Sequence, residues 1–271
     1  GENLVKTVSC SEPHAFAASD LPATHDFALA PAAPSRHNVV AYDCGVKRGI
    51  LEAGGFPVEF PVFSNGESNL RPTAMLTRNL ASMDVEESIR GNPMDAVVLL
   101  VGCDKTTPAL LMGAASVDIP TIVVSGGPML AGRHNGKNIS VSTMFEAAGK
   151  VESGQMTPEE MHQMEFQACP GCGSCSGLFT ANTMNCMMEA LGLGLPGNGT
   201  IPAVHAGRVR LAKEAGRAVM NLVEKNIKPR DILTPAAFRN ALTCEMAIGC
   251  STNSVLHLLA IGQIKCTARP T

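Results

Sequence analysis

The 271-residue chain is 45% hydrophobic and only 4% aromatic, and its formal net charge at pH 7 is −3. The sequence pI of about 6.2 excludes the basic surface typical of nucleic-acid-binding proteins. No apolar segment is as long as a membrane span and no signal-peptide pattern opens the chain, so we expect neither a nucleic-acid nor a membrane partner. Ten cysteines without a secretory signal favour a reducing compartment. We therefore expect a cytoplasmic protein, with an organelle as the alternative.

Both ends of the chain differ in pattern from the middle. Residues 1–37 are rich in Ala, Pro and Ser and have no sustained period, which predicts a disordered or unmatched segment. Residues 38–261 carry the patterns of an α/β domain. Residues 262–271 form an unpatterned basic tail after an apolar helix, so we expect an unmatched segment and a truncated or frame-altered end.

The first half of the domain alternates helical and strand patterns. The stretch VKRGILEAGG is typical of a helix that ends at Gly54-Gly55, because glycine is favoured just past a helix C-terminus. Apolar spacing and acidic first turns predict the elements that follow. These are a strand over residues 56–63, a helix over Thr73–Met83, a new helix from Asp84 and a strand over Ala96–Val101.

The second half continues the alternation with longer helices. A buried strand is expected at TIVVS, residues 121–125, followed by a glycine-rich and basic loop over residues 131–142. Helices are expected over residues 143–153, 157–166, 181–193, 204–226 and 234–248, and from the GCSTN motif to about Ile261. Strands alternating with longer helices favour an α/β fold, with a parallel sheet flanked by helices on both faces.

The segment VVLLVGCDKTTPA, residues 97–109, brings three unlike polar side chains to the end of a strand. Its apolar run suits a strand buried on both faces, and the Thr and Pro residues after it are typical of a helix start. Cys103, Asp104 and Lys105 therefore lie at the carboxyl edge of the sheet, where open α/β sheets bind ligands. Sulfur, oxygen and amine groups side by side at this edge indicate a ligand-binding site.

A second group of sulfur atoms follows in the C-x2-C-x2-C run of Cys169, Cys172 and Cys175. Spacings of two residues let thiolates converge on one ion or cluster, and the intervening glycines permit the tight turns required. The alternative is three small, buried residues in a glycine-rich turn. Together with Cys103, the run favours metal or iron–sulfur binding. Zinc would need four closed ligands, and a redox dithiol would need only one C-x2-C pair.

Four long motifs resemble the N-terminal half of the dihydroxy-acid dehydratase/phosphogluconate dehydratase family. They are VGCDKTTPALLMGAAS, VSGGPMLAG, CPGCGSCSGLFTANTMNCMMEALGL and GCSTNSVLHLLA, and the resemblance runs from about Val46 to Ile261. It implies an iron–sulfur cluster with an open iron position, 2Fe–2S rather than 4Fe–4S, beside a magnesium ion. It also implies a homodimer and the dehydration of a 2,3-dihydroxy acid to a 2-keto acid, in branched-chain amino-acid synthesis for the closest relatives.

The resemblance assigns roles to particular residues. Cys103 and Cys175 correspond to cluster ligands, which leaves Cys169 and Cys172 as structural residues. Asp104 resembles a magnesium ligand. Lys105 resembles a lysine carboxylated on its amine, so that the catalytic site holds magnesium through a carbamate; an ammonium that pairs with an anion is the alternative.

A further magnesium carboxylate is expected at Glu67, for which a glutamate in a surface turn is the alternative. An upstream cluster cysteine is also expected, and Cys44 is the only candidate, although it lies closer to Val46 than the family pattern places it. The family's β-rich C-terminal domain, which supplies a serine base and another magnesium glutamate, is missing. We therefore expect the chain alone to be inactive.

The substrate motifs point in two directions. The stretch from Gly54 to Leu80 resembles sugar-acid dehydratases, whereas the cysteine run and LPGNGT resemble branched-chain dihydroxy-acid dehydratases. An aldonate dehydratase is thus the alternative within the family. A non-catalytic iron–sulfur or zinc-binding fragment is the alternative outside it.

Overall fold

The structure, a computed structural model, describes residues 37–40, 45–66 and 70–267. The predictions for the two ends beyond these ranges, and those for Cys44 and Glu67, lie outside the described residues. The elements in chain order are β1 (His37–Val40), α2 (Val46–Glu52), β2 (Gly55–Val58), α3 (Met75–Arg90), β3 (Ala96–Val101), α4 (Thr106–Val117), β4 (Thr121–Ser125), β5 (Gly132–His134), β6 (Lys137–Ile139), α5 (Val141–Glu152), α6 (Pro158–Ala168), α7 (Thr180–Ala190), α8 (Ala206–Glu224), α9 (Pro229–Ile232), α10 (Pro235–Ile248) and α11 (Asn253–Thr267).

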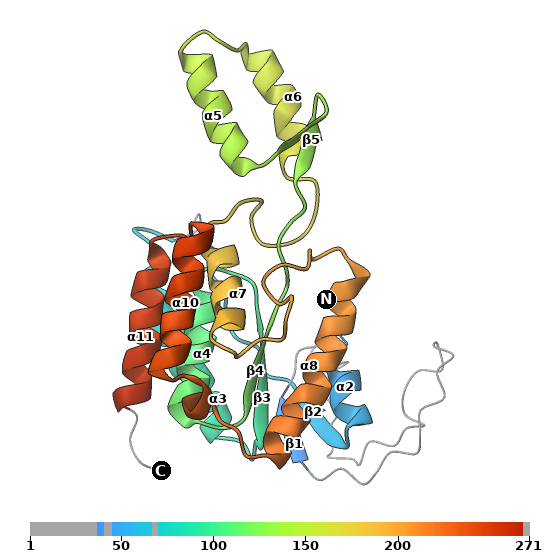
Figure 1. Cartoon of the computed structure of the whole chain (residues 1–271), viewed down its shortest axis with the longest axis vertical. Coiled ribbons are helices and arrows are strands. Elements are labelled where there is room, and N and C mark those ends of the chain that lie inside the picture. Colours follow the sequence, from blue (N-terminus) through green and yellow to red (C-terminus); the bar gives the residue numbers. More distant parts are fainter. Residues whose placement is uncertain (1–36, 41–44, 67–69, 268–271) are drawn as a thin grey trace, which may run out of the picture.

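A four-stranded parallel sheet with the order β2-β1-β3-β4 forms the centre of the body (Figure 1). The sequences AVVLLV of β3 and TIVVS of β4 consist mostly of β-branched and aliphatic residues, which suits central strands covered on both faces. These strands pair in register from Val97 with Thr121 to Val101 with Ser125, so they end together at one edge. The predicted α/β fold with a parallel sheet flanked by helices is confirmed.

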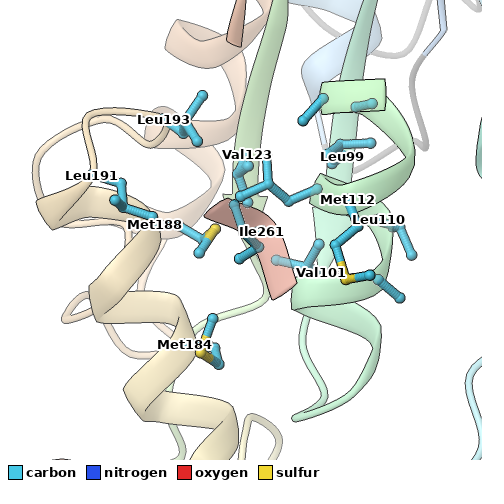
Figure 2. Close-up of a cluster of buried hydrophobic side chains, with 14 of the residues drawn as sticks. Leu99, Val101, Leu110, Met112, Val123, Met184, Met188, Leu191, Leu193 and Ile261 are labelled. Atoms are coloured by element: carbon cyan, nitrogen blue, oxygen red, sulfur yellow. The ribbon is translucent and has the colours of Figure 1, made fainter. Parts of the chain in front are cut away.

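The two faces of the sheet pack against different helices. Helices α2 and α8 cover one face, where Val98 and Val124 contact Ile50 and Val219 in one apolar cluster. Helices α3, α4, α7 and α11 cover the other face in a larger cluster that is rich in methionine. In Figure 2, Met184 and Met188 of α7 and Ile261 of α11 face the side chains of β3, β4 and α4. This second core holds α4, and with it the end of β3, in place.

Helices α2 and α8 approach closely because glycines meet at their crossing. A Cβ atom at Gly49 would lie 2.1 Å from the carbonyl oxygen of Lys213, and one at Gly216 would lie 2.3 Å from that of Val46. Both distances are far shorter than van der Waals contact, so neither position accepts a larger residue without a backbone shift.

An arm made of β5, β6, α5 and α6 projects from the body, beyond the end of β4 (Figure 1). The arm has its own small core of Ile139, Ala147, Met164 and Ala168. The prediction of a loop over residues 131–142 is wrong, because β5 and β6 form an antiparallel hairpin there. Its turn is Asn135-Gly136, with φ of 49° and 76°, the positive values that a two-residue hairpin turn requires.

Four further differences concern single helices or strands. The two helices expected from Thr73 and Asp84 form the single helix α3, since no glycine or proline interrupts the pattern between them. The strand expected over residues 56–63 ends at Val58, three residues before Pro61, which has no N–H to donate. Helix α11 extends past Ile261 to Thr267, with Ile264 packed against the larger core.

The fourth difference is β1, which the sequence analysis assigned to no element. It has four residues and a single short apolar run, so it lacks the alternation that marks a longer strand. Within the described ranges, every helix is too short or too polar to cross a membrane.

The helix crossing predicts opposite effects of alanine at two glycines. Gly216→Ala should lower the free energy of unfolding by about 1–3 kcal/mol, because its methyl group overlaps the α2 backbone. Gly149 lies in an exposed part of α5 and has no atom near the position of a Cβ. Gly149→Ala should therefore raise the free energy of unfolding by about 0.5–1 kcal/mol, because glycine is less favourable than alanine within a helix. Urea denaturation of both variants measures the difference. Equal effects at the two positions would contradict the crossing described here.

Candidate functional site

The turn from β3 into α4 has a fixed backbone. The N–H of Gly126 donates to the carbonyl of Val101 at 2.8 Å, which joins the end of β3 to the segment after β4. The Cys103 carbonyl accepts two hydrogen bonds from Thr107, from its N–H at 3.1 Å and from its hydroxyl at 2.9 Å. These bonds hold Cys103, Asp104 and Lys105 at the carboxyl edge of the sheet, where the sequence predicted them.

Asp104 and Lys105 form an ion pair in this turn. The Nζ atom of Lys105 lies 2.5 Å from Oδ2 of Asp104, and the N–H of Lys105 donates to Oδ1 at 2.9 Å. The side chain of Lys105 is 8% exposed and that of Asp104 is 18% exposed, so the pair is largely removed from water. A buried ion pair is costly when either partner is lost, which keeps the two charges together. Lys105 is therefore the ammonium partner of the Asp104 carboxylate in this structure.

Asp104 also acts on two cysteines. Burial is the main cause that raises the pKa of Cys103, and the Asp104 carboxylate raises it further, with the thiol donating to Oδ1 at 3.4 Å. Burial likewise raises the pKa of Cys175, and the Asp104 charge adds to the effect. One carboxylate thus lies within electrostatic range of both thiols, although they are far apart in the sequence. The structure brings Cys103 and Cys175 to the same side of the sheet.

A buried hydroxyl joins the two cysteine segments. The Oγ atom of Ser174 donates to the carbonyl of Gly102 at 3.1 Å and accepts from the Asn185 amide at 3.2 Å. The Ser174 N–H donates to the Gly127 carbonyl at 2.9 Å, and its carbonyl accepts from Met129 at 3.0 Å. The residues that precede Cys103 and Cys175 are therefore hydrogen-bonded to each other.

The other two cysteines of the C-x2-C-x2-C run differ from Cys103 and Cys175 in burial. Cys169 and Cys172 are exposed, whereas Cys103 and Cys175 are partly buried. In the part of the chain that the structure describes, no three His, Cys, Asp or Glu side chains are arranged to hold a metal ion. The ligand roles of Cys103 and Cys175 stay predictions.

An apolar cavity of about 390 Å³ opens beside Cys103. Most of its lining is aliphatic or aromatic, and Cys103, Thr106, Gly102 and Ser64 add a few polar groups at one end. The hydroxyl groups of Ser64 and Thr106 lie 2.6 Å apart. A mostly apolar pocket with a few convergent polar groups is typical of a small-molecule site.

A histidine and an arginine near the site were not predicted. His257 is fully buried, and its Nδ1 atom lies 3.2 Å from Nη1 of Arg78. The pKa of His257 is lowered to about 4, mainly by burial and in smaller part by the positive charges of Arg78 and Lys105, with Asp104 opposing them. The stretch SVLHLLA around His257 does not distinguish it from a core histidine, so the sequence held no signal for this position.

The donor types at this edge fit part of the group that the resemblance implies. Two partly buried thiols suit iron, and the carboxylate suits magnesium. The remaining ligand expected from the sequence, Glu67, lies outside the described residues, as does Cys44, the only upstream cysteine that was considered. The described residues are thus chemically suited to an iron–sulfur cluster at the thiols and a hard cation at the carboxylate.

Comparison with known proteins gives one family. A family model for the dihydroxy-acid/6-phosphogluconate dehydratase N-terminal domain matches residues 29–267. The dihydroxy-acid dehydratase of Acetivibrio thermocellus is 54% identical over 222 residues, which cover 80% of this chain and 40% of that protein. The dihydroxy-acid dehydratases of Moorella thermoacetica, 53% identical, and Clostridium botulinum strain Eklund 17B, 48% identical, match over similar shares. The chain therefore spans about 40% of the length of these relatives.

The thiol environments predict an order of alkylation in the reduced, metal-free chain. Cys169 and Cys172 should react first with iodoacetamide, because they are exposed. Cys103 and Cys175 should react more slowly, since burial raises their pKa and the thiolate is the reactive form. Cys186, with a pKa of about 11, should be among the slowest. Peptide mass spectrometry after a short pulse measures the order.

The chain unfolded in urea serves as the control for alkylation, because all cysteines should then react at similar rates. If Cys103 or Cys175 reacted as fast as Cys172 in the folded chain, the described burial of the site would be wrong.

Proposed function

We propose a dehydratase function for this chain, which belongs to the dihydroxy-acid/6-phosphogluconate dehydratase family. The reaction is the loss of water from a 2,3-dihydroxy carboxylic acid to give a 2-keto acid, a hydro-lyase reaction in branched-chain amino-acid synthesis. The observation that carries the proposal is the meeting of Cys103, Cys175 and the Asp104–Lys105 pair at one sheet edge. The proposed cytoplasmic location and homodimer remain predictions from the sequence.

The proposed cofactors are an iron–sulfur cluster, 2Fe–2S rather than 4Fe–4S, and Mg²⁺. Cys103 and Cys175 would hold the cluster, and Asp104, Lys105 and Glu67 would hold the magnesium. When bound, these groups supply Lewis acidity toward the hydroxyl and carboxylate oxygens of the substrate. The raised pKa of both thiols means that they are protonated without metal, so cluster binding must displace their protons.

Lys105 is the residue whose proposed chemistry differs most from its state in the structure. As an ammonium it donates to Asp104 and cannot bind a cation. As a carbamate it would place a second anionic group beside the Asp104 carboxylate. Two adjacent anions repel each other in a largely buried turn, and a divalent cation between them removes that repulsion. The carbamate and magnesium thus support each other in the proposed site.

The cavity beside Cys103 bears on the choice of substrate. Its walls include Phe60, Val62, Leu99 and Leu110, which offer no hydrogen bonds to a chain of hydroxyl groups. A short branched alkyl group suits such walls, whereas a sugar acid would leave several hydroxyls unpaired. The cavity therefore favours a branched-chain dihydroxy acid over the alternative, an aldonate.

Cluster binding can be tested by reconstitution with iron and sulfide under anaerobic conditions. The wild-type chain should show iron–thiolate charge-transfer absorbance. Cys103→Ala and Cys175→Ala should each lose most of it, because each removes a proposed ligand. Cys172→Ala is the matched control, since Cys172 is exposed and is not a proposed ligand. If both ligand variants kept the absorbance, the ligand assignment would be wrong.

Turnover can be tested by measuring keto-acid formation from 2,3-dihydroxyisovalerate and from arabinonate with the reconstituted chain. Faster turnover of dihydroxyisovalerate would support the branched-chain proposal, and faster turnover of arabinonate would support the sugar-acid alternative. A second candidate, left open by the sequence, is a cluster-binding unit without catalysis. A bound cluster with no turnover of either substrate would support that candidate.

A further inference from the structure

Two buried asparagines, Asn182 and Asn185, lie one turn apart on α7. Asn182 is 7% exposed and Asn185 is 0% exposed. Side chains three residues apart in a helix lie on the same face, and both of these reach the segment that carries Cys175. Met184 and Met188 of the same helix pack in the larger apolar core instead. Helix α7 therefore has a buried polar face toward the cysteine segment and an apolar face toward the core.

The polar face of α7 holds three consecutive parts of the cysteine segment. The Nδ2 atom of Asn182 donates to the carbonyl of Cys175 at 2.9 Å and to that of Gly177 at 2.5 Å. The Nδ2 atom of Asn185 donates to Oγ of Ser174 at 3.2 Å. The backbone is thus held before, at and after the residue that carries the thiol. We call Asn182 and Asn185 together the amide clamp.

Neither amide of the clamp can be turned over without losing its contacts. The Asn182 amide faces two carbonyl oxygens, which only accept hydrogen bonds. The Ser174 hydroxyl gives its one proton to the Gly102 carbonyl at 3.1 Å, so it needs a donor from Asn185. The amide nitrogen, and not the oxygen, therefore makes each contact.

The two amide oxygens of the clamp are left over. Both Oδ1 atoms are buried and make no hydrogen bond in the part of the chain that the structure describes. A buried acceptor without a donor is costly, and folded proteins seldom keep one without a reason. An apolar residue of similar shape would avoid this cost, so the stability of α7 alone does not explain an asparagine at either position. The contacts of the two amide nitrogens with the cysteine segment do explain it.

We propose that the amide clamp positions Cys175 as the ligand of the C-x2-C-x2-C run. The clamp fixes the backbone on both sides of this thiol, next to the bond from Ser174 to the end of β3. Cys169 and Cys172 precede the clamped residues in the chain. Asn182 and Asn185 are positioning residues, because they act through the cysteine segment. The inference rests on the proposed function, which gives Cys175 its ligand role.

The clamp can be tested in the metal-free chain with Asn182→Leu and Asn185→Leu. Both changes keep the approximate shape of the side chain and remove the donor. Iodoacetamide should then label Cys175 almost as fast as the exposed Cys172, because the segment is no longer held. Cys186, which lies on the same helix, should keep its slow rate. Peptide mass spectrometry after a short pulse measures the three rates.

The matched control is Met184→Leu, a change of similar volume on the apolar face of α7. It should leave the labelling of Cys175 unchanged. If Cys175 and Cys186 both became fast in the asparagine variants, Asn182 and Asn185 would serve only the folding of α7 and the inference would be wrong. An unchanged Cys175 rate in both variants would equally overturn it.

The anaerobically reconstituted chain gives a second readout. Loss of either clamp residue should lower the affinity for the iron–sulfur cluster by about tenfold or more, as loss of a contact that orients a ligand typically does. The absorbance retained as an iron chelator is added measures this affinity. Wild-type affinity in both variants would contradict the proposed role. A wild-type chain that bound no cluster would instead refute the proposed function, and the labelling rates would still decide whether the clamp holds Cys175.

A measurement without substitutions covers the case in which a variant does not fold. Nitrogen-15 NMR of the wild-type chain follows the exchange of side-chain amide protons with solvent. The NH2 protons of Asn182 should exchange far more slowly than those of Asn226, which is exposed. Equally fast exchange at the two positions would show that the Asn182 contacts do not persist, and would overturn the inference.

Discussion

The hydroxyl group of Ser174 sets the geometry on which the site depends. It donates to the Gly102 carbonyl and accepts from Asn185, so it ties the end of β3 to the start of the second cysteine segment. The next residue in each segment is a cysteine. The Ser174 hydroxyl, together with the backbone bonds of Ser174 to Gly127 and Met129, therefore holds Cys175 close to the end of β3.

The Asp104 carboxylate has a comparable role for charge. It pairs with Lys105, accepts from the Cys103 thiol and raises the pKa of Cys175. A lone carboxylate in this position would be costly, and the ammonium beside it removes most of that cost. In the metal-free chain the raised pKa of Cys103 and of Cys175 favours protonated thiols, and Lys105 balances the charge of Asp104. Any cation that enters must replace the ammonium or the thiol protons, which links metal binding to proton release.

Much of the site could be predicted from the sequence because local patterns determine it. The local pattern predicts a strand over the apolar run of β3, a turn after it and a helix that starts at Thr106. The structure has the same strand, turn and helix. The hairpin at Asn135-Gly136 was also predictable, since that dipeptide is a strong turn signal, but the basic composition around it suggested a loop. His257 was beyond prediction, because its importance arises from a contact with Arg78, 179 positions away in the chain. The separation of Cys175 from Cys169 and Cys172 depends likewise on packing that spacing does not encode.

The attachment of the arm has a consequence for how the family can vary in length. Two segments join the arm to the body (Figure 1), and the N–H of Met129 in the first donates to the carbonyl of Ser174 in the second. The two connections of the arm to the body are therefore held together next to the turn that carries Cys175. Residues can be gained or lost between α5 and α6 without changing the register of Cys175, because the anchoring bonds lie outside the region that changes. A longer or shorter connection between α5 and α6 is therefore expected to leave the position of Cys175 unchanged.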